Sequence, residues 1–178
     1  MTLTTSRLTR IALFTALIAV GAFISVPIGA VPITFQNFFV IMAGLLLAPA
    51  DAFLSVLIYM LLGLIGLPIF AGFRGGLQSV FSPSFGFIPG FAVGAYVIAK
   101  LTQGETRPIR LFLATVVGEL IFYAVGLPYL YYILQSMSKA PESFYALLAI
   151  GVIPFIPGDL FKMVICSVIT PKIKKAIK

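Results

Sequence analysis

The chain contains no histidine among its 178 residues. It therefore has no Ser/His triad, no HExxH zinc site and no histidine proton relay. The phosphate-binding pattern GxxxxGK(S/T) is also missing, so any energy from ATP has to come from a partner. The five Asp and Glu residues are scattered, whereas a metal-dependent transferase in the membrane needs clustered carboxylates. We therefore expect no enzyme activity, no cofactor and no metal site.

Cysteine and charge are scarce as well. The single cysteine, Cys166, stands in an apolar stretch and cannot form an intrachain disulfide. Only 10% of the residues are charged and 61% are hydrophobic, and so few charges cannot cover that much apolar surface in water. The twelve Lys and Arg residues cluster at the ends of apolar segments. Because they form no stripe with interleaved aromatic residues, we expect no nucleic-acid partner.

What the chain has in abundance is apolar segments of membrane-spanning type. They predict six transmembrane helices, at residues 11–27, 36–48, 52–67, 86–101, 109–134 and 144–170. A retained first helix explains the N-terminal run better than a cleaved secretory signal, because no clear A-x-A site follows it. The second segment is short enough to be re-entrant instead of spanning.

The distribution of basic residues decides between these topologies. If the second segment spans, Arg74 and Lys139 lie outside and nine basic residues lie inside: Arg7, Arg10, Lys100, Arg107, Arg110, Lys172, Lys174, Lys175 and Lys178. If it is re-entrant, most of them lie outside. We therefore predict an all-α, polytopic protein of the prokaryotic plasma membrane. It has six spans in one domain over residues 1–178, with both termini in the cytoplasm.

Proline is unevenly distributed on this topology. Three prolines fall on the inner side, and nine fall on the outer side: Pro27, Pro32, Pro68, Pro83, Pro89, Pro128, Pro141, Pro154 and Pro157. Irregular backbone at membrane depth survives only where protein or a polar cavity satisfies its N–H and C=O groups. We therefore expect a ligand pocket towards the outer face.

Two ionisable residues in the last helix, Asp159 and Lys162, are the first candidates for that pocket. Each charge at the centre of a bilayer costs about 2.5 to 3.5 kcal/mol on insertion scales, so such residues need a reason to be there. Pro157-Gly158 precedes Asp159, and a helix break there would place the carboxylate in the first turn of a half-helix, as in transporter binding sites. The alternative is a structural ion pair, since residues three apart share a helix face.

Two further segments carry candidate polar contacts. Arg74 lies in the glycine-rich stretch 70–76 and could present its guanidinium to a carboxylate, or it could be an ordinary solvated loop residue. Phe35, Gln36 and Asn37 open the short second helix after Thr34. They could read a polar ring, unless Thr34 only caps the helix and Gln36 faces water.

Glu119 is a third ionisable residue within a span, and Tyr123 lies one turn further on the same face. It fits two roles equally well: a ligand-binding group, or a structural carboxyl that is either protonated or paired with Lys162. Tyr123 is expected to pack within the bundle.

Helix 11–27 carries small residues at Ala12, Ala16, Ala19 and Ala22. Their spacing allows close helix approach. This face serves either packing within the bundle or docking of a membrane partner.

Together these features resemble the BioY family, the biotin-binding substrate-capture components of energy-coupling factor (ECF) transporters. The resemblance covers nearly the whole chain and rests on residues 31–37 (VPITFQN), 62–76 (LGLIGLPIFAGFRGG), 83–87 (PSFGF) with Gly90-Phe91, and 157–162 (PGDLFK). The chain departs from the family at Phe73, where Gly is frequent, and at 82–85, where Ser-Pro-Ser-Phe replaces the usual Gly-Pro-Thr-Gly.

The resemblance implies a six-helix capsule that binds biotin near the outer face and associates with a transmembrane coupling subunit and two ATPase subunits. We expect Asp159 to accept from the ureido N–H groups and Gln36 or Asn37 to contact the ureido carbonyl. Lys162 or Arg74 would neutralise the carboxylate, while Phe35 and Phe85 would wall the apolar ring. Ala12, Ala16 and Ala19 would face the coupling subunit. The alternatives are a self-sufficient proton-coupled carrier and a capture component for a different vitamin.

Overall fold

The computed structural model describes residues 4–176, and its secondary structure is almost entirely helical. The helices are α1 (Thr5–Phe23), α2 (Gln36–Leu46), α3 (Pro49–Leu64), α4 (Phe87–Leu101), α5 (Pro108–Ser136), α6 (Phe144–Gly151) and α7 (Ile156–Ala176). A 3-10 helix, η1 (Leu77–Phe81), lies between α3 and α4. Two short strands, β1 (Ser25–Val26) and β2 (Ile33–Thr34), form an antiparallel hairpin in which Ser25 faces Thr34.

All six predicted segments are helical, and five of them correspond to a single helix each. The sixth corresponds to the pair α6 and α7, which are bent by 51° at a short break. By length and hydropathy, α1 and α5 can each cross a membrane alone, and the bent pair is a third candidate span. The apolar helices α2, α3 and α4 are shorter, each with fewer than 18 residues.

The break before α7 lies slightly earlier than the sequence predicted. The helix begins at Ile156, so Pro157 and Gly158 fall inside its first turn instead of interrupting it. Proline is tolerated there because the first N–H groups of a helix have no carbonyl partner in any case. As expected, Asp159 lies in the first turn, near the positive end of the helix dipole.

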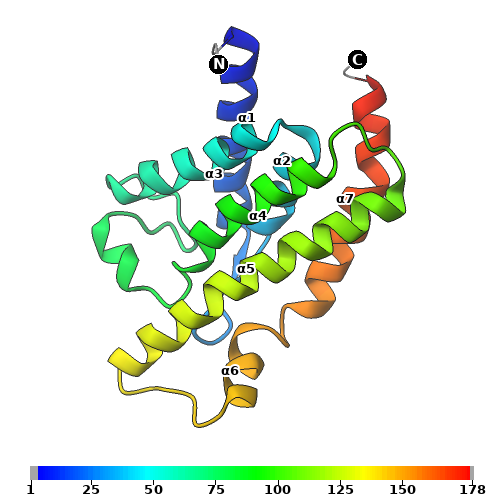
Figure 1. Ribbon diagram of the computed structural model, residues 1–178. Coiled ribbons are helices and arrows are strands. Elements are labelled where there is room, and N and C mark those ends of the chain that lie inside the picture. The colour runs from blue at the N-terminus through cyan, green and yellow to red at the C-terminus, as the bar shows by residue number, and fades with distance from the viewer. Residues whose placement is uncertain (1–3, 177–178) are drawn as a thin grey trace.

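Helix α2 lies at the centre of the bundle and contacts α1, α3, α4 and α7 (Figure 1). The contact with α4 is close, because a Cβ atom added at Gly44 would lie 2.8 Å from Cβ of Ile98. A short helix that is buried on all sides explains why the second apolar segment is brief and carries no charge.

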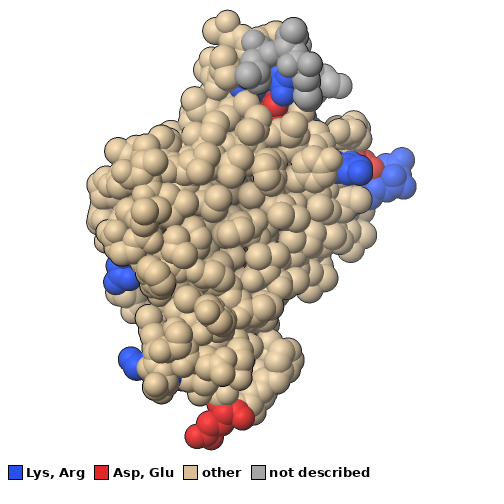
Figure 2. Space-filling model, turned by 60° about the vertical axis from the view of Figure 1, so that its left-hand side comes forward, with Lys and Arg blue, Asp and Glu red and all other residues tan. Residues whose placement is uncertain are grey.

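Both described ends of the chain lie at the same end of the bundle (Figure 1), as an even number of crossings requires. Eight of the nine basic residues predicted to lie inside belong to the first turns of α1, the end of α4, the start of α5 with the residue before it, and the end of α7: Arg7, Arg10, Lys100, Arg107, Arg110, Lys172, Lys174 and Lys175. Lys178 lies outside the described residues. On the face seen in Figure 2, charged side chains lie at the margins and the middle is uncharged, as a surface in contact with lipid requires.

Candidate ligand-binding site

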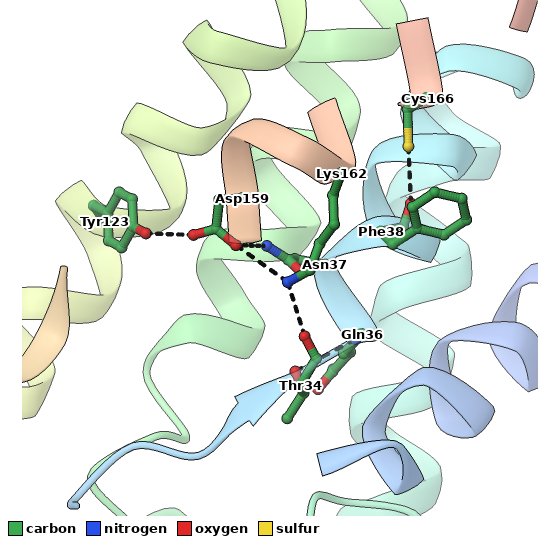
Figure 3. A network of polar contacts seen from close by, with 8 residues as sticks. All are labelled: Thr34, Gln36, Asn37, Phe38, Tyr123, Asp159, Lys162 and Cys166. Carbon is green, nitrogen blue, oxygen red and sulfur yellow. Dashed lines mark hydrogen bonds and ion pairs between the residues drawn. The ribbon is translucent and has the colours of Figure 1, made fainter. Parts of the chain in front are cut away.

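A buried polar cluster lies at the start of α7 (Figure 3). The ammonium nitrogen of Lys162 lies 2.7 Å from Oδ1 of Asn37, 2.9 Å from the carbonyl oxygen of Thr34 and 3.2 Å from Oδ1 of Asp159. An ammonium group has three donors, so these three acceptors occupy all of them. Asp159, Lys162 and Asn37 are 4%, 6% and 7% exposed, and their mutual bonds offset the cost of burying two charges.

The carboxylate of Asp159 is satisfied on both oxygens. Its Oδ1 also accepts from the side-chain amide of Asn37 at 2.7 Å, and its Oδ2 accepts from the hydroxyl of Tyr123 at 2.6 Å. The cluster therefore joins β2, α2, α5 and α7, which are far apart in the sequence (Figure 3). Tyr123, which the sequence analysis assigned to packing within the bundle, is a polar partner of the site.

A cavity of about 380 Å³ adjoins this cluster, within the range of small-molecule sites. It lies in the half of the bundle away from the chain ends, among the β1–β2 hairpin, the α3–α4 connection and the break before α7. Eight aromatic residues contribute to its wall: Tyr59, Phe70, Phe85, Phe87, Phe91, Phe122, Tyr123 and Phe155. A pocket with apolar walls and a few buried polar groups suits a small ligand that has both characters.

Arg74 is the second cation that lines the cavity. Its backbone is fixed by a tight turn, in which the N–H of Phe70 donates to the carbonyl of Arg74 at 2.9 Å and the N–H of Arg74 donates back at 3.3 Å. Its guanidinium has no hydrogen-bond or ion-pair partner among the described residues. The residue is exposed, so its five N–H donors can contact water as well as a ligand in the cavity.

Three buried side-chain atoms of the described residues have no hydrogen-bond partner: Nε2 of Gln36, Oγ of Ser79 and Oε2 of Glu119. Gln36, Ser79 and Glu119 are 5%, 7% and 7% exposed, and all three line the same cavity. Gln36 is therefore directed away from water. Ser79, on η1, was missed by the sequence analysis because a serine in a connecting segment carries no signal of burial.

The predicted aromatic contacts have different outcomes. Phe85 is buried, lines the cavity, and packs against Phe70 with ring centroids 6.1 Å apart. Phe35 is absent from the residues that line the cavity. It stacks on Phe38 at 4.6 Å and meets the edge of Phe39 at 5.8 Å, beside the start of α2.

The described residues contain no group of three or more His, Cys, Asp or Glu side chains that could hold a metal ion. Cys166 is a buried free cysteine. Its thiol approaches the carbonyl of Phe38 at 3.8 Å (Figure 3), so it packs as a small buried residue.

The apolar exterior, the bent final helix and the buried ion pair beside a cavity define a helical membrane protein with a small-molecule site. The model of the BioY family matches residues 1–178, and the chain belongs to this family. It is 38% identical to the biotin transporter BioY of Thermotoga maritima over 95% of this chain and 96% of that protein. It is 41% identical to a probable biotin transporter BioY of Pyrococcus horikoshii over 92% and 93% of the two chains.

The fold also matches a solved structure, the crystal structure of the S-component for biotin from an ECF-type ABC transporter. The TM-score is 0.81 at 29% identity, over 98% of this chain and 95% of that chain. The predicted family and the all-α, polytopic membrane fold are thereby confirmed. The chain is a multi-pass protein of the cell membrane.

Proposed function

We propose that this chain is the substrate-capture component of an ECF-type transporter and that it binds biotin in the 380 Å³ cavity. The observation that carries the proposal is the pairing of a buried polar cluster with an aromatic wall in one cavity. Biotin has the same two characters, because its ureido ring is polar and its thioether ring is apolar. The relatives named biotin transporters, and the S-component for biotin with the same fold, support this choice of ligand.

The occupied donors of Lys162 support one orientation of the ligand. Because Lys162 already donates to three protein acceptors, the unpartnered guanidinium of Arg74 is the better group for the biotin carboxylate. The ureido ring then lies at the buried end, near Asn37 and Gln36. The apolar ring lies against the wall formed by Phe70 and Phe85.

The partner module supplies the energy for transport in this proposal. The sequence has no GxxxxGK(S/T) pattern, so a coupling subunit and two ATPase subunits would drive release of the ligand into the cell. Ala12 and Ala16 on α1 are exposed and Ala19 is half-buried, whereas Ala22 is buried in the core. This exposure leaves a surface of small residues open to a membrane helix of the coupling subunit. The chain itself would bind biotin without changing it chemically.

Equilibrium binding of labelled biotin to the purified protein in detergent tests the ligand. We expect at least micromolar affinity, which Asp159→Asn and Lys162→Ala weaken. Glu142→Gln, in the exposed α5–α6 connection, is the matched control and should bind normally. Absence of biotin binding, or full binding by both site variants, would refute the proposal.

Two further measurements test the mode of transport. Ala16→Leu should abolish co-purification with the coupling and ATPase subunits and leave biotin binding unchanged; co-purification at the level of the unmodified protein would contradict this surface. Proteoliposomes that contain this chain alone should not accumulate biotin against its gradient when a proton gradient is applied. Accumulation there would favour a proton-coupled carrier.

A further inference from the structure

Glu119 is a buried carboxyl group that lines the cavity beside the polar cluster. It projects from α5, one turn before Tyr123, and lies next to Asp159 and Asn37. Its Oε2 has no hydrogen-bond partner, although the residue is only 7% exposed. Leaving a buried polar atom unpaired destabilises the folded protein, and more so for a charged group. Such a group in a ligand cavity needs an explanation.

Asp159 and Glu119 differ in the hydrogen bonds that their carboxyl oxygens already accept. Asp159 accepts from Asn37, Lys162 and Tyr123, so it already orders the polar cluster. Glu119 lines the cavity and keeps one oxygen without a hydrogen-bond partner. A ligand N–H group that reaches this end of the cavity therefore finds an unpaired acceptor on Glu119, whereas both oxygens of Asp159 already accept hydrogen bonds.

The second unpaired atom at this end is a donor, the side-chain amide nitrogen of Gln36. Gln36 lies in the first turn of α2 and lines the same cavity, with its side chain beside Tyr59. The cavity thus offers a free acceptor and a free donor from neighbouring helices. One unpaired acceptor and one unpaired donor suit a ligand that carries both an N–H and a C=O group, as a cyclic urea or lactam does.

We propose that Glu119 is a ligand-contacting, specificity-determining residue, whose Oε2 accepts a ring N–H of the ligand while Gln36 donates to the neighbouring carbonyl. The proposal rests on the proposed function, since biotin carries such a cyclic urea. Asp159 and Lys162 then act as positioning residues, which hold Asn37 and the start of α7 in place. A ligand without a ring N–H would lose this contact, and selection against it would follow.

The test compares biotin with biotin methylated on one or the other ureido nitrogen, for the unmodified protein and for Glu119→Leu. We expect Glu119→Leu to weaken biotin binding about 10- to 100-fold, because the ligand N–H is then buried without an acceptor. We also expect methylation of at least one nitrogen to weaken binding to the unmodified protein by a much larger factor than binding to Glu119→Leu. If Glu119 had only a structural role, methylation would weaken binding to the unmodified protein and to Glu119→Leu by the same factor.

Glu119→Gln provides the second variant, because it keeps the size and one acceptor oxygen of the side chain. It should fold if Glu119→Leu does not, bind biotin with intermediate affinity, and show a reduced effect of methylation. Glu142→Gln is the control with full affinity. This inference is wrong, while the proposed function stands, if both Glu119 variants bind biotin as tightly as the unmodified protein does. It is also wrong if each methylated ligand loses the same factor in affinity relative to biotin in the unmodified protein and in both variants. If the unmodified protein does not bind biotin, the proposed function itself fails.

Discussion

The ammonium nitrogen of Lys162 and the side-chain oxygen of Asn37 lie 2.7 Å apart and join α7 to α2 inside the bundle. The same ammonium group also holds the carbonyl of Thr34 at the end of the β1–β2 hairpin. One side chain therefore fixes three segments that border the cavity. Its first role is to build the site, and several measurable consequences follow from that role.

Replacing Lys162 with Met should destabilise the protein strongly. The substitution removes three hydrogen bonds and leaves the charge of Asp159 without its cation. Breaking a buried ion pair by removing one partner costs about 3 to 5 kcal/mol. Thermal unfolding in detergent can be followed with a thiol-reactive fluorophore, because Cys166 is the only cysteine in the sequence and is fully buried.

The double variant Lys162→Met/Asp159→Asn distinguishes this cause from a packing defect. Removing both charges should recover part of the lost unfolding temperature, because no buried charge then lacks a partner. If the unfolding temperature of the double variant falls by the sum of the decreases in the two single variants, Lys162 and Asp159 do not stabilise each other.

Replacing Arg74 should affect one end of the ligand only. Arg74→Ala is expected to weaken biotin about 10- to 100-fold, because a charge-assisted, bidentate contact with the carboxylate is lost. Biotin amide, which has no carboxylate, should bind Arg74→Ala and the unmodified protein with nearly equal affinity. Arg74→Lys should fall between them, since Lys offers a charge without the planar pair of donors. Equal weakening of biotin and its amide would place the carboxylate elsewhere.

Phe73 is a strained position in the α3–α4 connection. Its φ angle is +56°, a conformation that favours glycine, and its ring stacks on Phe23 at the end of α1 with centroids 4.6 Å apart. Phe73→Ala loses the stacking and keeps the strain, while Phe73→Gly loses the stacking and relieves about 1 kcal/mol of strain. We expect faster amide hydrogen exchange at residues 70–76 in both variants, and the greater increase in Phe73→Ala. Unchanged exchange in Phe73→Ala would show that the stacking does not hold the loop.

The α4–α5 connection at the basic end should respond to acid. Oε1 of Glu105 accepts from the backbone N–H groups of Arg107 and Thr106, each at 2.9 Å, and Oε2 pairs with Arg110 at 3.1 Å. These contacts lower the pKa of Glu105, with the N–H of Arg107 as the main cause. Because the pKa of Glu105 is lower in the folded protein, its ionised carboxylate stabilises the fold at every pH above the ordinary carboxyl pKa. This stabilisation is lost as the pH falls through the lowered pKa.

Amide exchange at Thr106 and Arg107 measures this effect against Glu105→Gln at each pH. Protection at these two amides should exceed that of the variant at neutral pH, and the difference should vanish in acid. A difference that stays constant with pH would show that ionisation of Glu105 is not its cause.

Hydropathy and charge predicted the helices well, because lipid imposes long apolar segments with basic ends. The observed α4 starts one residue after its predicted start at 86 and ends at the predicted Leu101. The first helix was placed too late, since Thr5–Arg10 form its first turns but are polar. Hydropathy detects the part of a helix that lies in lipid, and α1 extends beyond it.

The sequence predicted which residues form the candidate site, but not which role each residue has in it. Asp159 and Lys162 were identified because a charge inside a span needs a reason. The sequence could not reveal that Tyr123 and Asn37 donate hydrogen bonds to Asp159, because those bonds cross between helices far apart in the chain. Nor could it separate Lys162, whose donors are occupied, from Arg74, whose donors are free. Hydrogen-bond saturation is a property of the packed structure alone.

The atoms without partners, on Gln36, Ser79 and Glu119, are not among those that hold the start of α7 against α2. A change at one of these three positions therefore alters what the cavity can recognise and leaves the bonds of Lys162 in place. Lys162 and Asp159, in contrast, cannot change without loss of the bundle's own stability. A capsule built in this way can acquire a new ligand through single substitutions, and retargeting by design should begin at the same three positions.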